Sequence, residues 1–257
     1  MLVALVAVGI TVAVVSAIRG IWSPCGLSML SSITPMTEAG RGYRFRSTAT
    51  WFLVGGIAGG ATLGLTGAAG AWGLHALGTD ETTRLLLGGL LLVATAAIDL
   101  GLAGIELPIF KRQVNDAWLR RYRSWVYGAG FGWQIGVGLA TYIMTAGVFA
   151  TLGLAALTGE PLAAMVVGLV FGVARGSAVF LGRSATTPAA LGRVHARLDA
   201  RGPASQRAAA GGQVVGAGIL LALAVHPLVG VAVPLALVGI ASARHRVHPS
   251  PVPAASR

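Results

Sequence analysis

Charged residues and cysteine are scarce in this 257-residue sequence. Charged residues make up 11% of the chain, against about 25% in a typical soluble domain, while hydrophobic residues make up 55%. This balance excludes a disordered chain, a coiled coil and almost every soluble enzyme fold. The single cysteine excludes an internal disulfide and a four-cysteine metal site. The composition therefore predicts an all-α, polytopic helical membrane bundle.

Long apolar runs supply the predicted transmembrane helices, because a helix needs about 20 apolar residues to cross the hydrocarbon core. Six runs qualify: Leu2–Ile33, Thr50–Leu77, Leu85–Leu107, Val126–Leu157, Leu162–Leu181 and Val214–Ser242. Arg19 and Pro24 interrupt the first run, and two crossings there would give seven spans. Pro227 and Pro234 are expected to kink the sixth run. No basic residue precedes the first run, so we interpret it as a retained helix and not as a signal peptide.

Basic residues gather in the loops that follow spans one, three and five. These loops hold 13 of the 19 Lys and Arg residues, and the intervening loops hold Asp80, Glu81 and Glu160. Because Lys and Arg stay on the cytoplasmic side of a membrane, we predict a plasma-membrane protein with cytoplasmic basic loops and both termini outside. The lipid bilayer, and not nucleic acid, is the partner that this placement indicates.

The spans divide into two sets of three. The predicted parts are a first half (residues 1–110), a basic cytoplasmic linker (111–125), a second half (126–243) and a disordered tail (244–257). Three spans per half place the halves in opposite orientations, as in inverted repeats whose site lies near the bilayer midplane. His245 and His248 in the tail have no supporting carboxylate or cysteine, so no metal site and no cofactor is predicted.

The first candidate site lies around Pro24 and Cys25. Pro24 has no backbone N–H, so the helix is expected to open there. Ser28 follows Cys25 by three residues and shares its helix face. A thiol beside broken helix is a candidate redox or ligand site; the alternative is a small residue at a packed interface.

The segment Trp22–Leu30 (WSPCGLSML) resembles the first-helix motif of the CcdA/DsbD family of cytochrome c biogenesis proteins and thiol–disulfide transporters, in the LysE-like superfamily. The resemblance implies six helices in two inverted halves. It also implies that two cysteines, one in each half, pass reducing equivalents from cytoplasmic thioredoxin to extracytoplasmic thiols.

The segment Phe131–Gly138 (FGWQIGVG) resembles the motif that opens the second half of that family, with Gly136 in place of the second cysteine. A reversible dithiol couple needs two thiols close enough to bridge. Cys25 can still form a mixed disulfide, either with a partner protein such as a thioredoxin-like thiol partner or with a low-molecular-weight thiol. Because Gly136 holds the position of a site residue, Trp133 and Gln134 are expected beside it in a central pocket, as a stacking face and a polar ligand.

The second candidate site consists of charges inside spans. A charge at the bilayer centre costs about 2.5–3.5 kcal/mol, so such residues face partners or water. We predict that Asp99 pairs with Arg175, while Arg19 and Glu106 lie nearer the interface. The pair is interpreted either as an ion pair that locks the fold or as part of a proton relay or solute pocket.

Three functional classes follow. The first is a thiol-linked redox or maturation protein that uses Cys25. The second is a small-solute or ion transporter that uses Asp99, Arg175 and Gln134. The third is a non-catalytic membrane subunit. The oligomeric state stays open, because glycine-rich faces pack equally well within and between chains.

Overall fold

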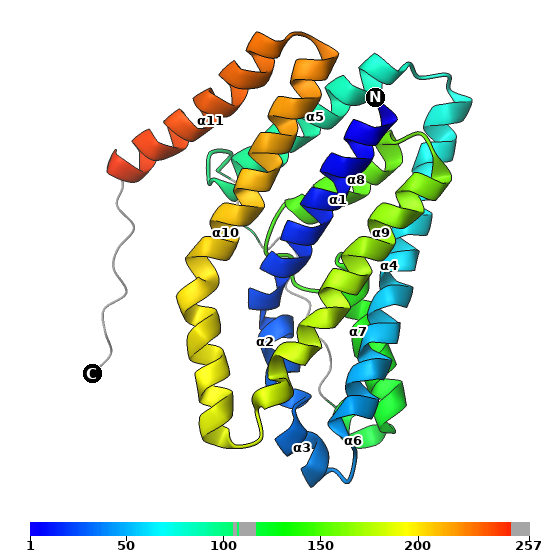
Figure 1. The fold of residues 1–257 in the computed structure, drawn as a ribbon, viewed down its shortest axis with the longest axis vertical. Helices are drawn as coiled ribbons and strands as arrows, with labels where there is room; N and C mark the ends of the chain where they lie inside the picture. The colour runs from blue at the N-terminus through cyan, green and yellow to red at the C-terminus, as the bar shows by residue number, and fades with distance from the viewer. Residues whose placement is uncertain (105–106, 108–116, 248–257) are drawn as a thin grey trace.

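The computed structural model describes residues 1–104, 107 and 117–247, and within these ranges every regular element is a helix. The chain forms a bundle whose long helices run along one axis (Figure 1). The elements are α1 (Leu2–Arg19), η1 (Gly20–Trp22), α2 (Pro24–Ser32), α3 (Pro35–Gly40), α4 (Phe45–Ala76), α5 (Glu81–Asp99), α6 (Trp118–Arg121), α7 (Ser124–Val137), α8 (Gly147–Leu157), α9 (Pro161–Ser177), η2 (Ala178–Ser184), α10 (Pro188–Ala224) and α11 (Pro227–Val247). Glu106, the first part of the predicted linker (111–116) and the end of the tail (248–257) lie outside the described residues.

Six stretches of described helix are long and apolar enough to cross a membrane, which confirms the predicted polytopic helical class. They are Leu2–Trp22, Phe45–Ala76, Glu81–Asp99, Pro161–Ser184, Pro188–Ala224 and Pro227–Arg244. The predicted kinked span Val214–Ser242 is wrong, because the chain turns between Ala224 and Pro227 and makes two helices. Pro227 opens the second of them, where its missing N–H costs no helical bond.

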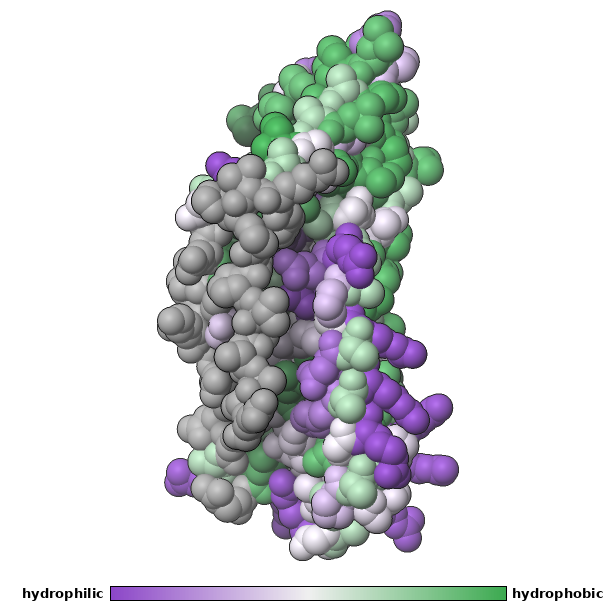
Figure 2. Space-filling model, turned by 90° about the vertical axis from the view of Figure 1, so that its left-hand side faces the viewer, coloured by the Kyte–Doolittle hydropathy of each residue, from purple (hydrophilic) through white to green (hydrophobic). Residues whose placement is uncertain are grey.

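The basic segment after span five is helical and not a loop. Thr187 caps α10 by accepting a hydrogen bond from the Ala190 N–H, and Pro188 occupies the first helical position. The helix then runs for 37 residues. Its first half carries exposed arginines on one side, and Figure 2 shows hydrophilic residues in the lower part of this face and hydrophobic residues above them.

Two of the predicted spans are broken, and each break has a local cause. After η1, the Ser23 hydroxyl accepts a hydrogen bond from the Gly26 N–H at 3.0 Å, and Pro24 starts α2. The predicted span Val126–Leu157 divides into α7 and α8, joined by a nonhelical connection. Gly138 begins this connection with φ +74°, a conformation that favours glycine. The break between η1 and α2 confirms the predicted opening of the first helix at Pro24.

The helices of the two predicted halves run in opposite directions (Figure 1). The α1–α2 unit, α4 and α5 correspond in order to the α7–α8 unit, α9 and α10. Second helices pack on each other, α4 against α9, and so do third helices, α5 against α10. This pattern supports the proposal of two inverted halves, with α11 as an additional helix that packs on α10.

Glycines let α4 pack closely on two neighbours. On one side, a Cβ at Gly136 of α7 would lie 2.8 Å from Gly56 Cα. On the other side, a Cβ at Gly60 of α4 would lie 2.6 Å from Gly172 Cα of α9. Real Cβ atoms essentially never approach this closely, so these contacts require glycine.

Candidate polar site inside the bundle

Asp99 is the centre of a polar cluster at the end of α5. Its Oδ1 accepts a hydrogen bond from the Ala146 backbone N–H at 2.8 Å. Its Oδ2 accepts one from Gln213 Nε2 at 2.6 Å and a short one from the Thr145 hydroxyl. The half-buried carboxylate thus joins α5, the connection between α7 and α8, and α10.

The length of α8 separates this cluster from the end of the bundle where α5 begins. The eleven residues of α8 rise about 16 Å, which is about half of a 30 Å hydrocarbon core. Thr145 and Ala146 lie at the start of that helix. Its other end lies beside the start of α5, because Arg84 donates a hydrogen bond to the Thr158 carbonyl at 2.9 Å.

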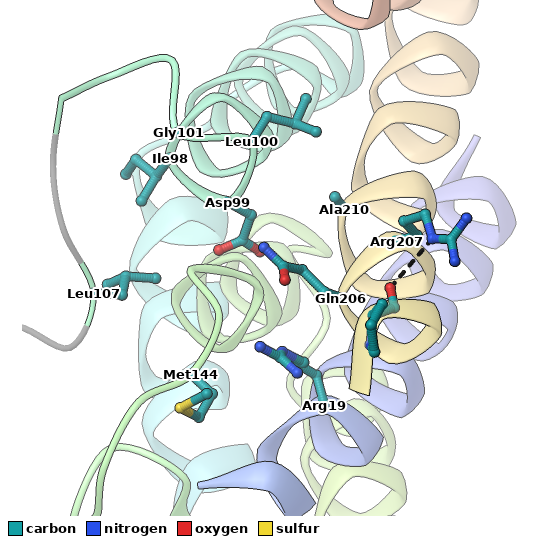
Figure 3. Close-up of a pocket in the computed structure, with 11 residues that line it drawn as sticks. Arg19, Ile98, Asp99, Leu100, Gly101, Leu107, Met144, Gln206, Arg207 and Ala210 are labelled. Atoms are coloured by element: carbon teal, nitrogen blue, oxygen red, sulfur yellow. Dashed lines mark hydrogen bonds between the residues drawn. The ribbon is translucent and has the colours of Figure 1, made fainter. Parts of the chain in front are cut away.

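A cavity of about 530 Å³ opens beside Asp99. Arg19 from α1 and Gln206 and Arg207 from α10 are among its lining residues, together with Asp99. In Figure 3 the Arg19 and Gln206 side chains point into the space beside Asp99, whereas the Arg207 guanidinium points away from Asp99. Arg19 Nη1 donates to the Ser205 hydroxyl at 3.1 Å, and Arg19 interacts electrostatically with Asp99. Two arginines and one carboxylate therefore line the cavity, and the Arg19 guanidinium is the one beside Asp99.

Two buried polar atoms near this cluster make no hydrogen bond with a described residue. They are the Ser16 hydroxyl oxygen and Gln213 Oε1, on side chains that are 1% and 0% exposed. Gln213 Nε2 donates to both Asp99 and the Ala209 carbonyl, which fixes the orientation of the amide. Gly147 lies beside both Ser16 and Gln213. A Cβ at this position would collide with the Ser16 hydroxyl, so glycine is needed there.

The predicted pairing of Asp99 with Arg175 is wrong. Arg175 lies on α9, which packs on α1 and α4, whereas Asp99 ends α5, which packs on α8 and α10. The Arg175 guanidinium is buried and donates to the Ala17 carbonyl at 3.4 Å. It occupies the space above Gly20, where any Cβ would overlap it.

Cys25 lies at the second position of α2 and is 3% exposed. It interacts electrostatically with Arg175 across the break between α1 and α2. Ser28 is half-buried one turn further along the same helix. The structure thus places Cys25 and Pro24 inside the protein beside one intramembrane charge, while the roles predicted for them stay predictions.

The predicted pocket around Gly136 is not formed. Gly136 packs against the Gly56 backbone, so the position of the family's second cysteine has no room for a side chain. Trp133 is 43% exposed and points outward, where its Nε1 donates to the Thr62 hydroxyl of α4 at 3.1 Å. Gln134 is half-buried on α7, outside the lining of the Asp99 cavity.

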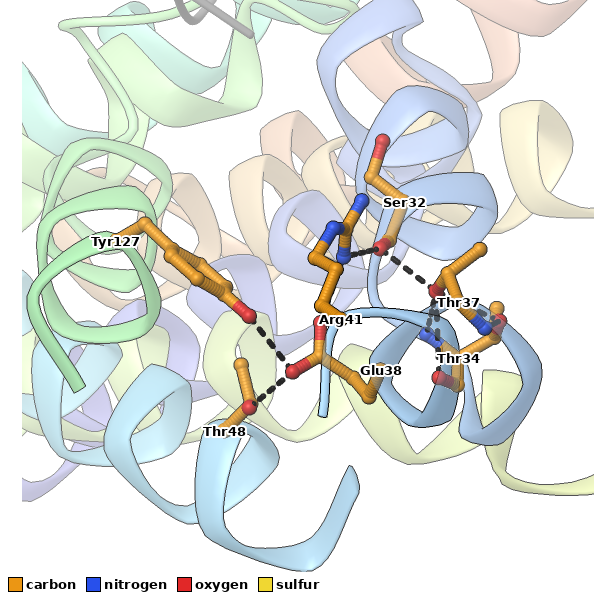
Figure 4. A network of polar contacts seen from close by, with 7 residues as sticks. All are labelled: Ser32, Thr34, Thr37, Glu38, Arg41, Thr48 and Tyr127. Carbon is orange, nitrogen blue, oxygen red and sulfur yellow. Dashed lines mark hydrogen bonds and ion pairs between the residues drawn. The ribbon is translucent and has the colours of Figure 1, made fainter. Parts of the chain in front are cut away.

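A second polar cluster surrounds Glu38, which the sequence analysis missed. Glu38 is fully buried; its Oε1 pairs with Arg41 Nη1 at 2.8 Å, and its Oε2 accepts hydrogen bonds from the Thr48 and Tyr127 hydroxyls at 2.5 and 2.7 Å (Figure 4). The cluster ties α3 to α4 and α7. Because all of its donors are on the chain itself, it stabilises the fold and leaves little capacity for a ligand.

Sequence alone did not identify Thr145, Gln213 or Glu38 either. Thr145 and Gln213 lie 46 and 114 residues from Asp99, so only the fold brings them together. A glutamate next to a basic loop looks the same whether it is buried or solvated. The one available signal was Gln213 itself, an amide at the edge of an apolar run, because polar residues within membrane helices usually face the bundle interior.

These features define the chain as a polytopic helical membrane protein with a polar cavity inside its bundle. Its sequence is similar to Methylamine utilization protein MauF of Methylophilus methylotrophus, with 33% identity over 182 residues, covering 67% of this chain and 61% of that protein. MauF of Methylobacillus flagellatus is 28% identical over 184 residues, covering 67% and 61% of the two chains.

MauF of Paracoccus denitrificans is 31% identical over 168 residues, covering 63% of this chain and 59% of that protein. The matched region therefore spans about three fifths of these relatives. No protein-family model and no solved structure matches the chain. The resemblance to the CcdA/DsbD family stays a prediction.

Proposed function

We propose that this chain is a membrane component of methylamine utilization and that its Asp99 cavity binds a small solute with an anionic group. The names of the related proteins support the first part. The observation that carries the second part is the cavity beside the intramembrane Asp99, with Arg19 and Arg207 in its lining.

The hydrogen bonds around the cavity favour an anion over methylammonium. Both oxygens of Asp99 already accept hydrogen bonds from the protein, three in all. Arg19 donates to described residues through Nη1 alone, and Arg207 through Nε alone. Arg19 therefore offers spare N–H donors beside Asp99, and Arg207 adds positive charge to the lining of the cavity, which suits a carboxylate or a similar anion.

Growth on methylamine tests the cellular role. We expect that deletion of the gene prevents methylamine-dependent growth and that Asp99→Asn fails to restore it, although the variant reaches the membrane. Asp199→Asn is the matched control, because Asp199 is exposed on α10 and does not line the cavity. Normal growth of the Asp99→Asn strain would contradict the role of the cavity.

Thermal unfolding of the purified protein in detergent tests the solute class. We expect acetate to raise the Tm and methylammonium chloride to leave it unchanged, with Arg207→Gln removing the effect of acetate. Arg193→Gln removes the same charge outside the cavity and should keep that effect. Stabilisation by methylammonium, or equal effects of acetate on both variants, would refute an anion site.

A second candidate function uses Cys25, and its burial together with its electrostatic interaction with Arg175 favours this function. In this proposal, the Cys25 thiolate attacks the disulfide of a maturation substrate, forms a mixed disulfide with it, and releases the substrate's other thiolate. A thiolate of a reduced thioredoxin-like partner then attacks the Cys25 sulfur, which releases the substrate with both thiols reduced. The partner's second cysteine attacks this new mixed disulfide, which releases Cys25 and leaves the partner oxidised. The electron pair thus passes from the partner to the substrate for thiol or cytochrome maturation without a second cysteine in this chain.

Trapping tests the thiol proposal. A thioredoxin that lacks its resolving cysteine should form a covalent adduct with the wild-type protein in cells and none with Cys25→Ser. If Cys25→Ser supports full methylamine-dependent growth and no adduct forms, the thiol proposal is wrong. The Asp99 proposal does not depend on this outcome.

The orientation is part of the same proposal. We place the protein in the plasma membrane with the end that bears Arg44, Arg183 and Arg193 in the cytoplasm, on the basis of the loop charges. In a Cys25→Ser background, Arg193→Cys should resist a membrane-impermeant maleimide in intact cells and react in opened ones. Labelling in intact cells would reverse the orientation.

A further inference from the structure

A groove of about 950 Å³ lies at the basic end of the bundle, apart from the Asp99 cavity. It runs between α3, the start of α4 and η2. Arg44 and Arg46 of α4 and Arg183 of η2 line it together with Phe45 and Phe180. No carboxylate is among its lining residues.

Two tryptophans on α4 indicate the depth of this groove. Trp51 and Trp72 are 42% and 68% exposed and are 21 residues apart, which is about 32 Å along a helix. Exposed tryptophans mark the membrane interfaces, and the hydrocarbon core is about 30 Å thick. Trp51 also packs against the exposed Trp125 of α7, with ring centroids 6.1 Å apart. Arg44 and Arg46 lie one to two turns before Trp51, at the depth of lipid headgroups, and Arg183 lines the same groove.

The positive charge in the groove is not neutralised by the protein. Arg44, Arg46 and Arg183 form no ion pair with a described residue. The carboxylate of Glu38 in α3 is fully buried, pairs with Arg41, and accepts hydrogen bonds from the Thr48 and Tyr127 hydroxyls.

The start of α4 adds to this charge. Arg44 occupies the N-cap position without a capping hydrogen bond from its side chain, so the N–H groups of the first turn face the same region as the arginines. Phe45 and Phe180 are half-buried and give the groove an apolar wall. A negatively charged oxygen group is stabilised at a helix N-terminus.

We propose that this groove binds the phosphodiester headgroup of an anionic phospholipid. Three arginines supply the charge-assisted hydrogen bonds that a phosphate accepts. The headgroup depth and the apolar wall distinguish a lipid from free phosphate, because only a lipid brings acyl chains that gain from the contact.

Lipid titration of the full-length protein in detergent, followed by native mass spectrometry, tests the proposal. We expect phosphatidylglycerol to bind in preference to phosphatidylcholine. The variant Arg44→Gln/Arg46→Gln/Arg183→Gln should bind phosphatidylglycerol more weakly by roughly tenfold or more. The matched control Arg193→Gln/Arg197→Gln/Arg201→Gln removes the same charge from the exposed side of α10 and should keep the wild-type affinity.

Three outcomes would overturn the proposal. Equal weakening in the two triple variants would show that only overall charge matters. Equal binding of the two lipids would exclude headgroup recognition. Full competition by inorganic phosphate at the groove would show that the ligand is a free anion. Size-exclusion profiles matching the wild type establish that the variants are folded before lipid is added.

Discussion

The contact between Gly136 and α4 predicts that a methyl group at this position destabilises the protein. A Cβ at Gly136 would lie 2.8 Å from Gly56 Cα and 2.9 Å from the Gly56 carbonyl carbon. Carbon atoms are separated favourably by about 3.5–4.0 Å, so the two helices would have to move apart by about 1 Å. The obstructing atoms are backbone, so no side-chain rotation relieves the overlap.

The magnitude follows from two opposing terms. Overpacking costs about 1–3 kcal/mol, and a displacement of α7 would also loosen the close contacts that Gly128 and Gly132 make with α4. Alanine gains up to about 1 kcal/mol over glycine from helix propensity. We therefore expect Gly136→Ala to lower the free energy of unfolding by about 1–2 kcal/mol.

Equilibrium unfolding in mixed detergent–SDS micelles, followed by tryptophan fluorescence, measures this change. Gly73→Ala is the matched control, because Gly73 also lies within a helix, α4, but a Cβ there meets nothing within 4 Å. That variant should be as stable as the wild type or more stable. A Gly136→Ala protein as stable as Gly73→Ala would refute the close packing and would reopen position 136 to a cysteine.

Three further predictions concern other parts of the bundle. Glu38→Gln should lower the free energy of unfolding by about 3–5 kcal/mol, because it leaves Arg41 without its buried partner. Tyr127→Phe removes only one hydrogen bond to Glu38 and should lower the free energy of unfolding by about 1.5–3 kcal/mol. Chemical unfolding compares the two variants, and equal losses would contradict a cluster that depends on the charge of Glu38. Hydrogen bonds from Thr83 hold the pKa of Asp80 below its usual value. The stability that the Asp80 cap gives to α5 is therefore fully present at a pH above the usual pKa of an aspartate. This stability is lost as the pH falls through the lowered pKa of Asp80. Asp80→Asn should therefore reduce the dependence of the free energy of unfolding on pH in this acidic range. An unchanged pH dependence would refute a stabilising role of the Asp80 carboxylate as the cap of α5. Cys25 should resist maleimide in the folded protein and react after SDS denaturation; rapid labelling of the native protein would contradict its burial.

Hydropathy and proline placement predicted the helical class and the break at Pro24, because both are local properties of the sequence. The same reasoning misjudged the first half of α10. Arginines there suggested a solvated loop, yet Thr187 and Pro188 form a helix start that is visible in the sequence. The charged residues of a segment indicate that it is exposed to water, but they do not indicate whether the segment is a loop or a helix.

The candidate site was predictable only in part. Asp99 could be recognised because a carboxylate inside an apolar span needs partners, but the partners depend on which helices are neighbours. A single sequence does not show which helices are neighbours. The predicted pairing of Asp99 with Arg175 was wrong for this reason. The predicted pocket at Gly136 failed for a similar reason. A glycine at the motif position was interpreted as part of a pocket, but a glycine is also what close packing of two helix backbones requires.

The glycines of α4 also determine which part of the molecule is able to move. Between α4, α7 and α9 the backbones touch, so no rotamer change accommodates sliding, and these three helices form a rigid frame. The interface of α5 with α10 is instead made by side chains such as Leu221, which a Cβ at Gly89 would meet. Side chains can repack at that interface, so a change in the shape of the Asp99 cavity is expected from movement of α5 and α10 and not from sliding among α4, α7 and α9.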